Sequence, residues 1–213
     1  MNIKQKSSLI IFFRMALCLA PILPNFAYAQ GVTLLQNFVR NVNTAQGIFQ
    51  QTQLASNGKV TAQSSGQFSF ARPGKFIWAT QKPYEQLLQS DGRVLYFFDK
   101  DLNQVTIRQL DAALAASPAA ILFGSGALER HFKLKDGPIR EGVQWVELEP
   151  LIKDSSFTHI AVGFRRNVLA GMELRDTLGN ATALIFDRVD TRPLPAGYSF
   201  SFKPPKDAEV VRN

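Results

Sequence analysis

Apolar and polar side chains alternate along residues 66–108, in four short runs separated by turn-forming residues. The separators are Arg72-Pro73-Gly74, Lys82-Pro83 and Asp91-Gly92. Alternation with a period of two, bounded by Pro and Gly, is typical of antiparallel strands with one apolar face. The pattern therefore predicts a β-meander over this stretch.

One arginine shares the apolar face of this meander. Phe68, Phe70, Arg72, Phe76 and Trp78 have the same parity, so without a bulge they lie on one side of the sheet. A charge among four aromatic rings is costly unless another group pairs with it. We therefore expect Arg72 to have a specific partner.

The rest of the chain gives a similar pattern with two exceptions. Helical spacing of Val32, Leu34, Leu35, Phe38, Val39 and Val42 predicts an amphipathic helix over 32–45. The Ala-rich stretch 110–131 predicts one or two short helices, broken at Pro118 and at Gly124-Ser125-Gly126. Strands are expected at 47–55, 60–71, 75–81, 84–90, 93–98, 103–108, 132–135, 143–148, 157–164, 168–175, 181–188 and 197–202. Turns are expected at Asn57-Gly58, Asp136-Gly137 and Gly179-Asn180.

The N-terminus has the pattern of a secretory signal peptide. Lys4, Lys6 and Arg14 precede or begin a mostly apolar run, and Ala27-Tyr28-Ala29 is a small-x-small cleavage site. The segment lacks the long clean apolar run of a membrane anchor. Leu17 before Cys18 also disfavours a lipoprotein cleavage site. We expect residues 1–29 to be removed and residues 30–213 to form a single domain.

Removal of the leader changes the chemistry of the chain. Its only cysteine, Cys18, leaves with the signal, so neither a disulfide nor thiol chemistry is expected. Three of the cations behind the formal net charge of +7 leave too. The remaining excess is modest and scattered, which argues against nucleic acid as a partner and fits weak attraction to acidic partners or an anionic membrane surface. An ordinary solvated surface explains the charge equally well.

Catalytic and metal-binding motifs are scarce. The histidines are His131 and His159, and no HExxH, CxxC, GxSxG or phosphate-binding loop is present. The segment 124–126 is better explained as a helix break than as a nucleophile turn, and Glu147 and Glu149 as a solvated sheet edge. The sequence predicts no metal, cofactor or enzyme activity, with a hydrolase as an alternative.

Aromatic residues are the positive signal. The chain has 17 Phe, and several strands carry apolar residues on both faces, as at 94–98 and 157–164. A single sheet with a solvated outer face does not need this pattern. Either a second layer covers the sheet or one face lines an apolar cavity; the Ala-rich segment favours a cavity closed by helices.

Several motifs in order resemble the outer-membrane lipoprotein carrier family (LolA), over essentially the whole chain after the leader. They are Arg72-Pro73-Gly74-Lys75-Phe76-Ile77-Trp78, Pro83-Tyr84-Glu85-Gln86-Leu87, Ser90-Asp91-Gly92, the aromatic run 96–98, the stretch 99–102, Gln104-Val105-Thr106, Ser117-Pro118-Ala119-Ala120-Ile121-Leu122 and Phe200-Ser201-Phe202-Lys203-Pro204-Pro205.

The resemblance implies a periplasmic protein whose fold is an incomplete antiparallel β-barrel of about eleven strands with a lid of short α-helices. Such a monomer takes triacylated lipoproteins from an inner-membrane ABC transporter and delivers them to an outer-membrane acceptor. By the same resemblance Arg72 holds the lid shut. The expected acyl-chain cavity is lined by Phe49, Phe68, Phe70, Phe76 and Trp78, and the inward-facing lid residues are Leu34, Leu35, Phe38, Ile121 and Leu122. A carrier of another envelope lipid or glycolipid is the alternative on this fold.

Overall fold

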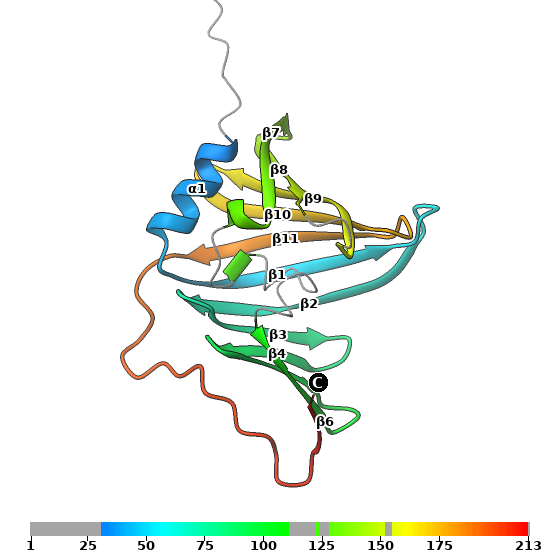
Figure 1. Ribbon diagram of the computed structural model, residues 1–213, viewed down its shortest axis with the longest axis vertical. Helices are drawn as coiled ribbons and strands as arrows, with labels where there is room; N and C mark the ends of the chain where they lie inside the picture. Colours follow the sequence, from blue (N-terminus) through cyan, green and yellow to red (C-terminus); the bar gives the residue numbers. More distant parts are fainter. Residues whose placement is uncertain (1–30, 111–121, 124–127, 152–154, 213) are drawn as a thin grey trace, which may run out of the picture.

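The computed structural model of the chain describes residues 31–110, 122–123, 128–151 and 155–212 (Figure 1). A twelve-stranded sheet dominates it, together with an α-helix and a 3-10 turn. The elements are α1 (Gly31–Asn41), β1 (Thr44–Leu54), β2 (Val60–Ala71), β3 (Lys75–Lys82), β4 (Gln86–Asp91), β5 (Val94–Asp99), β6 (Gln104–Gln109), η1 (Leu128–Arg130), β7 (Phe132–Arg140), β8 (Val143–Pro150), β9 (Phe157–Arg165), β10 (Val168–Asp176), β11 (Ala181–Asp190) and β12 (Glu209–Arg212).

The sheet is open, because its two end strands are not paired with each other. Its order is β12-β6-β5-β4-β3-β2-β1-β11-β10-β9-β8-β7. Neighbours are antiparallel except β12, which runs parallel to β6. The expected incomplete β-barrel is confirmed, with twelve strands instead of about eleven and one parallel pair. Figure 1 shows the sheet curving, with α1 against the end formed by β7, β8 and β9.

Helix α1 closes one end of the inner face. Its buried side chains Leu35 and Phe38 lie one turn apart, as an amphipathic helix requires. The helix ends at Asn41, four residues before the predicted end, because the chain has to enter β1 at Thr44. The Val42 N–H donates to the Phe38 carbonyl and closes the last turn.

The predicted turn at Asp136-Gly137 is wrong. Strand β7 continues to Arg140, and its register with β8 shifts between Asp136 and Ile139, which marks a bulge. The bulge places the Asp136 carboxylate at the start of α1, where it accepts a 2.8 Å hydrogen bond from the Val32 N–H. A carboxylate there satisfies a free helix donor and complements the helix dipole.

The predicted strand 197–202 is also wrong. Residues 191–208, which we call the strap, cross the outer face of the sheet without joining its ladder. The Tyr198 hydroxyl lies 2.9 Å from Ser69 Oγ, and the Phe202 ring lies 5.3 Å from that of Tyr96. An extended segment lying flat on an apolar face alternates like a strand, which explains the misinterpretation. After the strap the chain enters β12, which pairs with β6 at the edge of the sheet.

Candidate functional site

The five aromatic residues predicted to line a cavity lie together on the inner face. They come from β1, β2 and β3, where the register pairs Phe68 with Trp78 and Phe70 with Phe76. The Phe49 and Trp78 rings stack at 4.0 Å between centroids. All are buried, and Phe70 and Phe76 have no exposed surface. The structure therefore places these rings in one packed apolar cluster.

Phe123 fills the space above this cluster, although it was not among the cavity residues predicted from the sequence. Its ring stacks on Phe70 at 4.6 Å and on Phe68 at 5.4 Å, with interplanar angles of 17° and 11°. It is completely buried, and its neighbour Leu122 is 2% exposed. Phe123 thus covers the faces of the Phe68 and Phe70 rings. The sequence hint was its place beside Ile121 and Leu122 in the Ala-rich segment.

Arg72 is bonded to two main-chain carbonyls. Its Nε donates to the Val42 carbonyl at 3.0 Å, and its Nη2 donates to the Leu122 carbonyl at 3.2 Å. Val42 follows α1, and Leu122 precedes Phe123. Arg72, in the β2–β3 turn, therefore joins the sheet to both segments that cover its inner face.

Among the described residues no carboxylate pairs with Arg72. Its charge is stabilised by main-chain carbonyl dipoles and by aromatic rings. Its guanidinium carbon lies 5.0 Å from the Phe70 ring centroid and 5.5 Å from that of Phe38. Burial lowers its pKa to about 10, so the guanidinium stays protonated at neutral pH. Carbonyl dipoles and aromatic faces offset the lost hydration only in part. The Arg72 guanidinium would therefore gain hydration if the segments it is bonded to moved away.

The predicted lid residues fall in three groups. Leu35, Phe38 and Leu122 are buried, and the Phe38 ring lies 6.0 Å from that of Phe70. Leu34 is partly buried and packs against the same core. Ile121 lies outside the described residues, as do residues 1–29.

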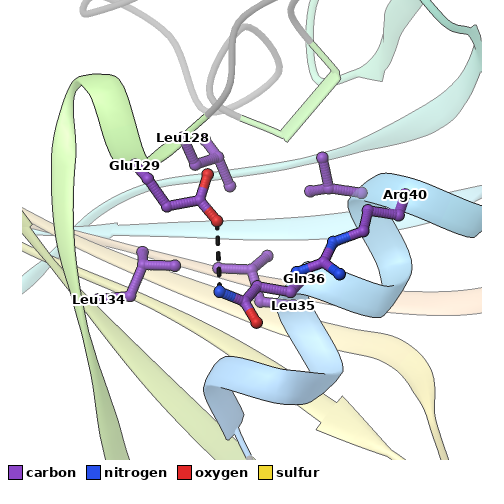
Figure 2. Close-up of a pocket in the computed structure, with 7 residues that line it drawn as sticks. Leu35, Gln36, Arg40, Leu128, Glu129 and Leu134 are labelled. Atoms are coloured by element: carbon purple, nitrogen blue, oxygen red, sulfur yellow. Dashed lines mark hydrogen bonds between the residues drawn. The ribbon is translucent and has the colours of Figure 1, made fainter.

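A cavity of about 200 Å³ lies between α1 on one side and η1 with the start of β7 on the other (Figure 2). Leu35 and Val39 of α1 line one side, and Leu128 of η1 and Leu134 of β7 line the other. One polar contact spans it, in which Gln36 Nε2 donates to Glu129 Oε1 at 3.4 Å. The two covering segments therefore meet through a mostly apolar, loosely bridged gap.

Among the described residues, those considered for catalysis do not assemble into a site. Glu147 lies opposite Lys135 across β7 and β8, with an N–O distance of 3.8 Å, as expected on a solvated sheet face. Residues 124–126 lie outside the described ranges. Within those ranges, no three His, Cys, Asp or Glu side chains are placed to hold a metal ion. No helix there is long and apolar enough to cross a membrane.

Comparison with known proteins gives consistent matches. The family model described as outer membrane lipoprotein carrier protein LolA matches residues 40–203. A Cupriavidus necator protein named outer-membrane lipoprotein carrier protein is 52% identical over 189 residues, covering 87% of this chain and 90% of that protein. A Bordetella pertussis protein of the same name is 40% identical over 209 residues, covering 98% and 97%.

Solved structures share the fold at low sequence identity. The structure of an uncharacterized conserved protein from Thermus thermophilus matches with a TM-score of 0.52 and 14% identity. The match covers 85% of this chain and 98% of that chain.

Proposed function

The chain belongs to the outer-membrane lipoprotein carrier family (LolA), and on that premise we propose that it holds the acyl chains of lipoproteins against its inner face. The observation that carries the proposal is the position of Phe123, stacked on Phe70 and Phe68 beneath a cover joined to the sheet by Arg72. The unloaded protein fills its own ligand site, and loading exchanges Phe123 for an acyl chain.

The exchange keeps the free energy of loading small. Each buried CH₂ contributes about 0.8 kcal/mol, so three chains of about fifteen carbons would cost roughly 35 kcal/mol to expose. Non-covalent binding saturates near 20 kcal/mol. A carrier must therefore shield the chains incompletely and must also release them. Displacing Phe123 and breaking two Arg72 bonds opposes binding, and their return favours release.

The gap between α1 and η1 is the proposed entrance. Leu35, Val39, Leu128 and Leu134 give it apolar walls, and the 3.4 Å contact between Gln36 and Glu129 is the polar bridge across it. Separating the two segments there exposes the inner face without breaking any strand ladder. We propose that α1 and the residues around Leu122 move while the sheet stays fixed.

The cellular setting is proposed with the same function. Removal of residues 1–29 on export places residues 30–213 in the periplasm as a single domain. The monomer receives triacylated lipoproteins from an inner-membrane ABC transporter and delivers them to an outer-membrane acceptor. It performs no chemical step on its cargo, and the transporter's ATP hydrolysis supplies the energy of extraction.

The test is capture of an acylated cargo. The exported chain is incubated with membrane vesicles that contain the transporter, ATP and a triacylated lipoprotein; soluble one-to-one complexes are then isolated. The same lipoprotein with its acylated cysteine replaced by serine is the control and should not be captured. Mass spectrometry of the protein purified from cells identifies the natural ligand. Bound glycolipid without lipoprotein would favour the alternative carrier, and equal capture of the unacylated control would overturn the proposal.

A further inference from the structure

Strands β10 and β11 separate at one end of the sheet. Their last register pair is Gly171 with Ile185, although β10 begins at Val168 and β11 runs on to Asp190. Beyond this pair β10 follows β9, with a register shift, and β11 follows β1. The sheet is thus split between two strands that are neighbours elsewhere along their length.

A cavity of about 260 Å³ occupies this split. Its floor is apolar, with Leu169 and Phe186 exposing only 2% and 6% of their surface. Its rim carries Arg165, Arg166 and Arg188, with Asp187 as the acidic residue among its lining. The Phe186 ring lies 5.5 Å from that of Phe68, so the floor continues into the aromatic cluster.

Arg188 stands where glycine would be the less strained residue. The register of β11 with β1 shifts here, and Arg188 has a φ of 50°. A side chain in this left-handed region is strained, whereas glycine adopts it freely. The Asp187 carboxylate accepts the Arg188 N–H at 2.8 Å and supports the bulge. Despite this strain, Arg188 is among the residues that line the cavity in the split.

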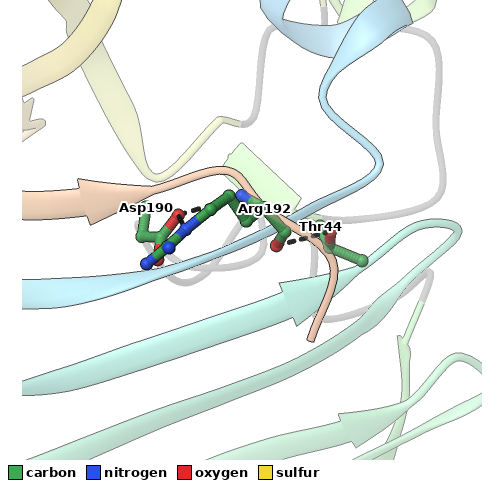
Figure 3. A network of polar contacts seen from close by, with 3 residues as sticks. All are labelled: Thr44, Asp190 and Arg192. Atoms are coloured by element: carbon green, nitrogen blue, oxygen red, sulfur yellow. Dashed lines mark hydrogen bonds and ion pairs between the residues drawn. The ribbon is translucent and has the colours of Figure 1, made fainter. Parts of the chain in front are cut away.

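The rim arginines differ from their neighbour Arg192 in their partners. Figure 3 shows Arg192 in a two-pronged ion pair with Asp190, at 2.6 Å for the shorter contact, beside Thr44. No ion pair joins Arg165, Arg166 or Arg188 to a carboxylate of the described residues, and Arg165 donates to the main-chain carbonyl of Glu141. Three guanidinium groups over a single carboxylate leave a net positive rim.

We propose that this split binds the phosphate of an anionic membrane phospholipid, with Arg165, Arg166 and Arg188 on the phosphate and the proximal acyl carbons against Leu169 and Phe186. Guanidinium groups match phosphate oxygens in geometry and charge. A headgroup held there orients this end of the sheet toward an anionic lipid surface while cargo moves into or out of the protein.

The apolar floor selects this ligand over two others. Free inorganic phosphate would satisfy the arginines but leave Leu169 and Phe186 without a partner. An acidic peptide would present carboxylates on a polar backbone, which the floor cannot pair. A phosphate joined to an acyl chain satisfies both parts of the cavity.

The experiment is vesicle flotation with the purified exported chain. Vesicles of phosphatidylcholine alone are compared with vesicles that also contain phosphatidylglycerol, with and without inorganic phosphate. Each arginine near an anionic surface is expected to contribute about fivefold in partitioning, so replacing all three by glutamine should reduce binding by about a hundredfold. The matched control removes three charges from the opposite strand ends, as Lys59→Gln, Lys82→Gln and Lys133→Gln together.

A single substitution distinguishes a loss of lipid binding from a loss of stability. Arg188→Gly relieves the positive φ, so its melting temperature should rise while its binding to phosphatidylglycerol vesicles falls about fivefold. Equal loss of binding in the triple variant and its control would mean diffuse attraction and overturn the proposal. Displacement by inorganic phosphate at equal concentration would assign the site to a small anion, and arginine-dependent binding to a membrane protein without lipid binding would assign it to a protein partner; either overturns it. Uptake of an apolar probe tests the cargo function separately and should not change in Arg188→Gly.

Discussion

Arg72 joins the β2–β3 turn to the main-chain carbonyl of Leu122, with 3.2 Å between its Nη2 and the oxygen. The residue after Leu122 is Phe123, whose ring stacks on Phe70 at 4.6 Å. Phe70 lies near the end of β2, two residues before Arg72. One short segment is therefore held at two adjacent points, by a polar bond and by an aromatic stack. We expect the Arg72 hydrogen bond and the Phe123 stack to be released together, because Leu122 and Phe123 are adjacent in the chain and one cannot move away without displacing the other.

Arg72→Leu should favour the open form of the cover. The variant loses two hydrogen bonds, each worth about 1 kcal/mol net, and regains part of this by removing a half-buried charge. We expect up to about tenfold faster amide exchange at Leu122 and Phe123, slower release of a bound apolar probe, and a smaller increase in probe uptake. Arg192→Leu, which breaks an ion pair outside the site, is the control. Unchanged exchange in Arg72→Leu would remove its role in holding the cover.

Arg72→Lys should make opening depend on pH above about pH 8. Burial lowers the pKa of Arg72 from 12.5 to about 10. A similar effect would bring the lysine ammonium from about 10.4 to about 8 in the closed form. The closed form then binds its proton less tightly than the open form, so closure becomes more favourable as pH rises. Probe uptake by the variant should fall as the pH rises above about pH 8, whereas uptake by the unaltered protein should stay constant up to about pH 9. A flat profile in the variant would mean that the ammonium remains hydrated.

Phe76→Glu should weaken binding of an apolar fluorescent probe. The Phe76 ring has no exposed surface, and a carboxylate in its place costs several kcal/mol unless it is protonated. The control is Ile185→Glu, which adds the same charge on the outer face at a position that is 61% exposed. Circular dichroism checks that both variants fold, and Phe76→Leu serves if the glutamate variant does not. Equal probe binding in folded Phe76→Glu and Ile185→Glu would assign these rings to an ordinary core.

Local patterns in the sequence predicted the strands that pair with their neighbours along the chain. Alternation and turn residues placed β2 to β6 within a few residues, because each hairpin is specified by its own turn and apolar face. The parity of Arg72 with Phe68 and Phe70 correctly indicated that its charge required a partner. The same parity placed the aromatic cluster on one face.

Contacts between distant segments were not predictable in this way. Asp136-Gly137 has the composition of a turn, but its carboxylate caps α1 from about a hundred residues away. Tyr198 and Phe202 alternate like strand residues because they lie on the sheet, not within it. The stacking of Phe123 on Phe70 and the separation of β10 from β11 likewise depend on how remote elements pack.

Phe123→Ala should bind apolar ligands more tightly although the protein becomes less stable. Phe123 is completely buried, and losing a buried Phe side chain typically costs about 3–5 kcal/mol through lost burial and an unfilled space. In the proposed loading step the same ring competes with the ligand for the face of Phe70 and Phe68, so its removal should raise the fraction of binding-competent protein. Thermal unfolding should therefore shift down while the dissociation constant for an apolar probe decreases. Tyr84→Ala removes an aromatic ring that is 65% exposed and should change neither quantity. If Phe123→Ala lowered both stability and probe affinity, Phe123 would be part of the binding surface, and ligand would have to enter beside it.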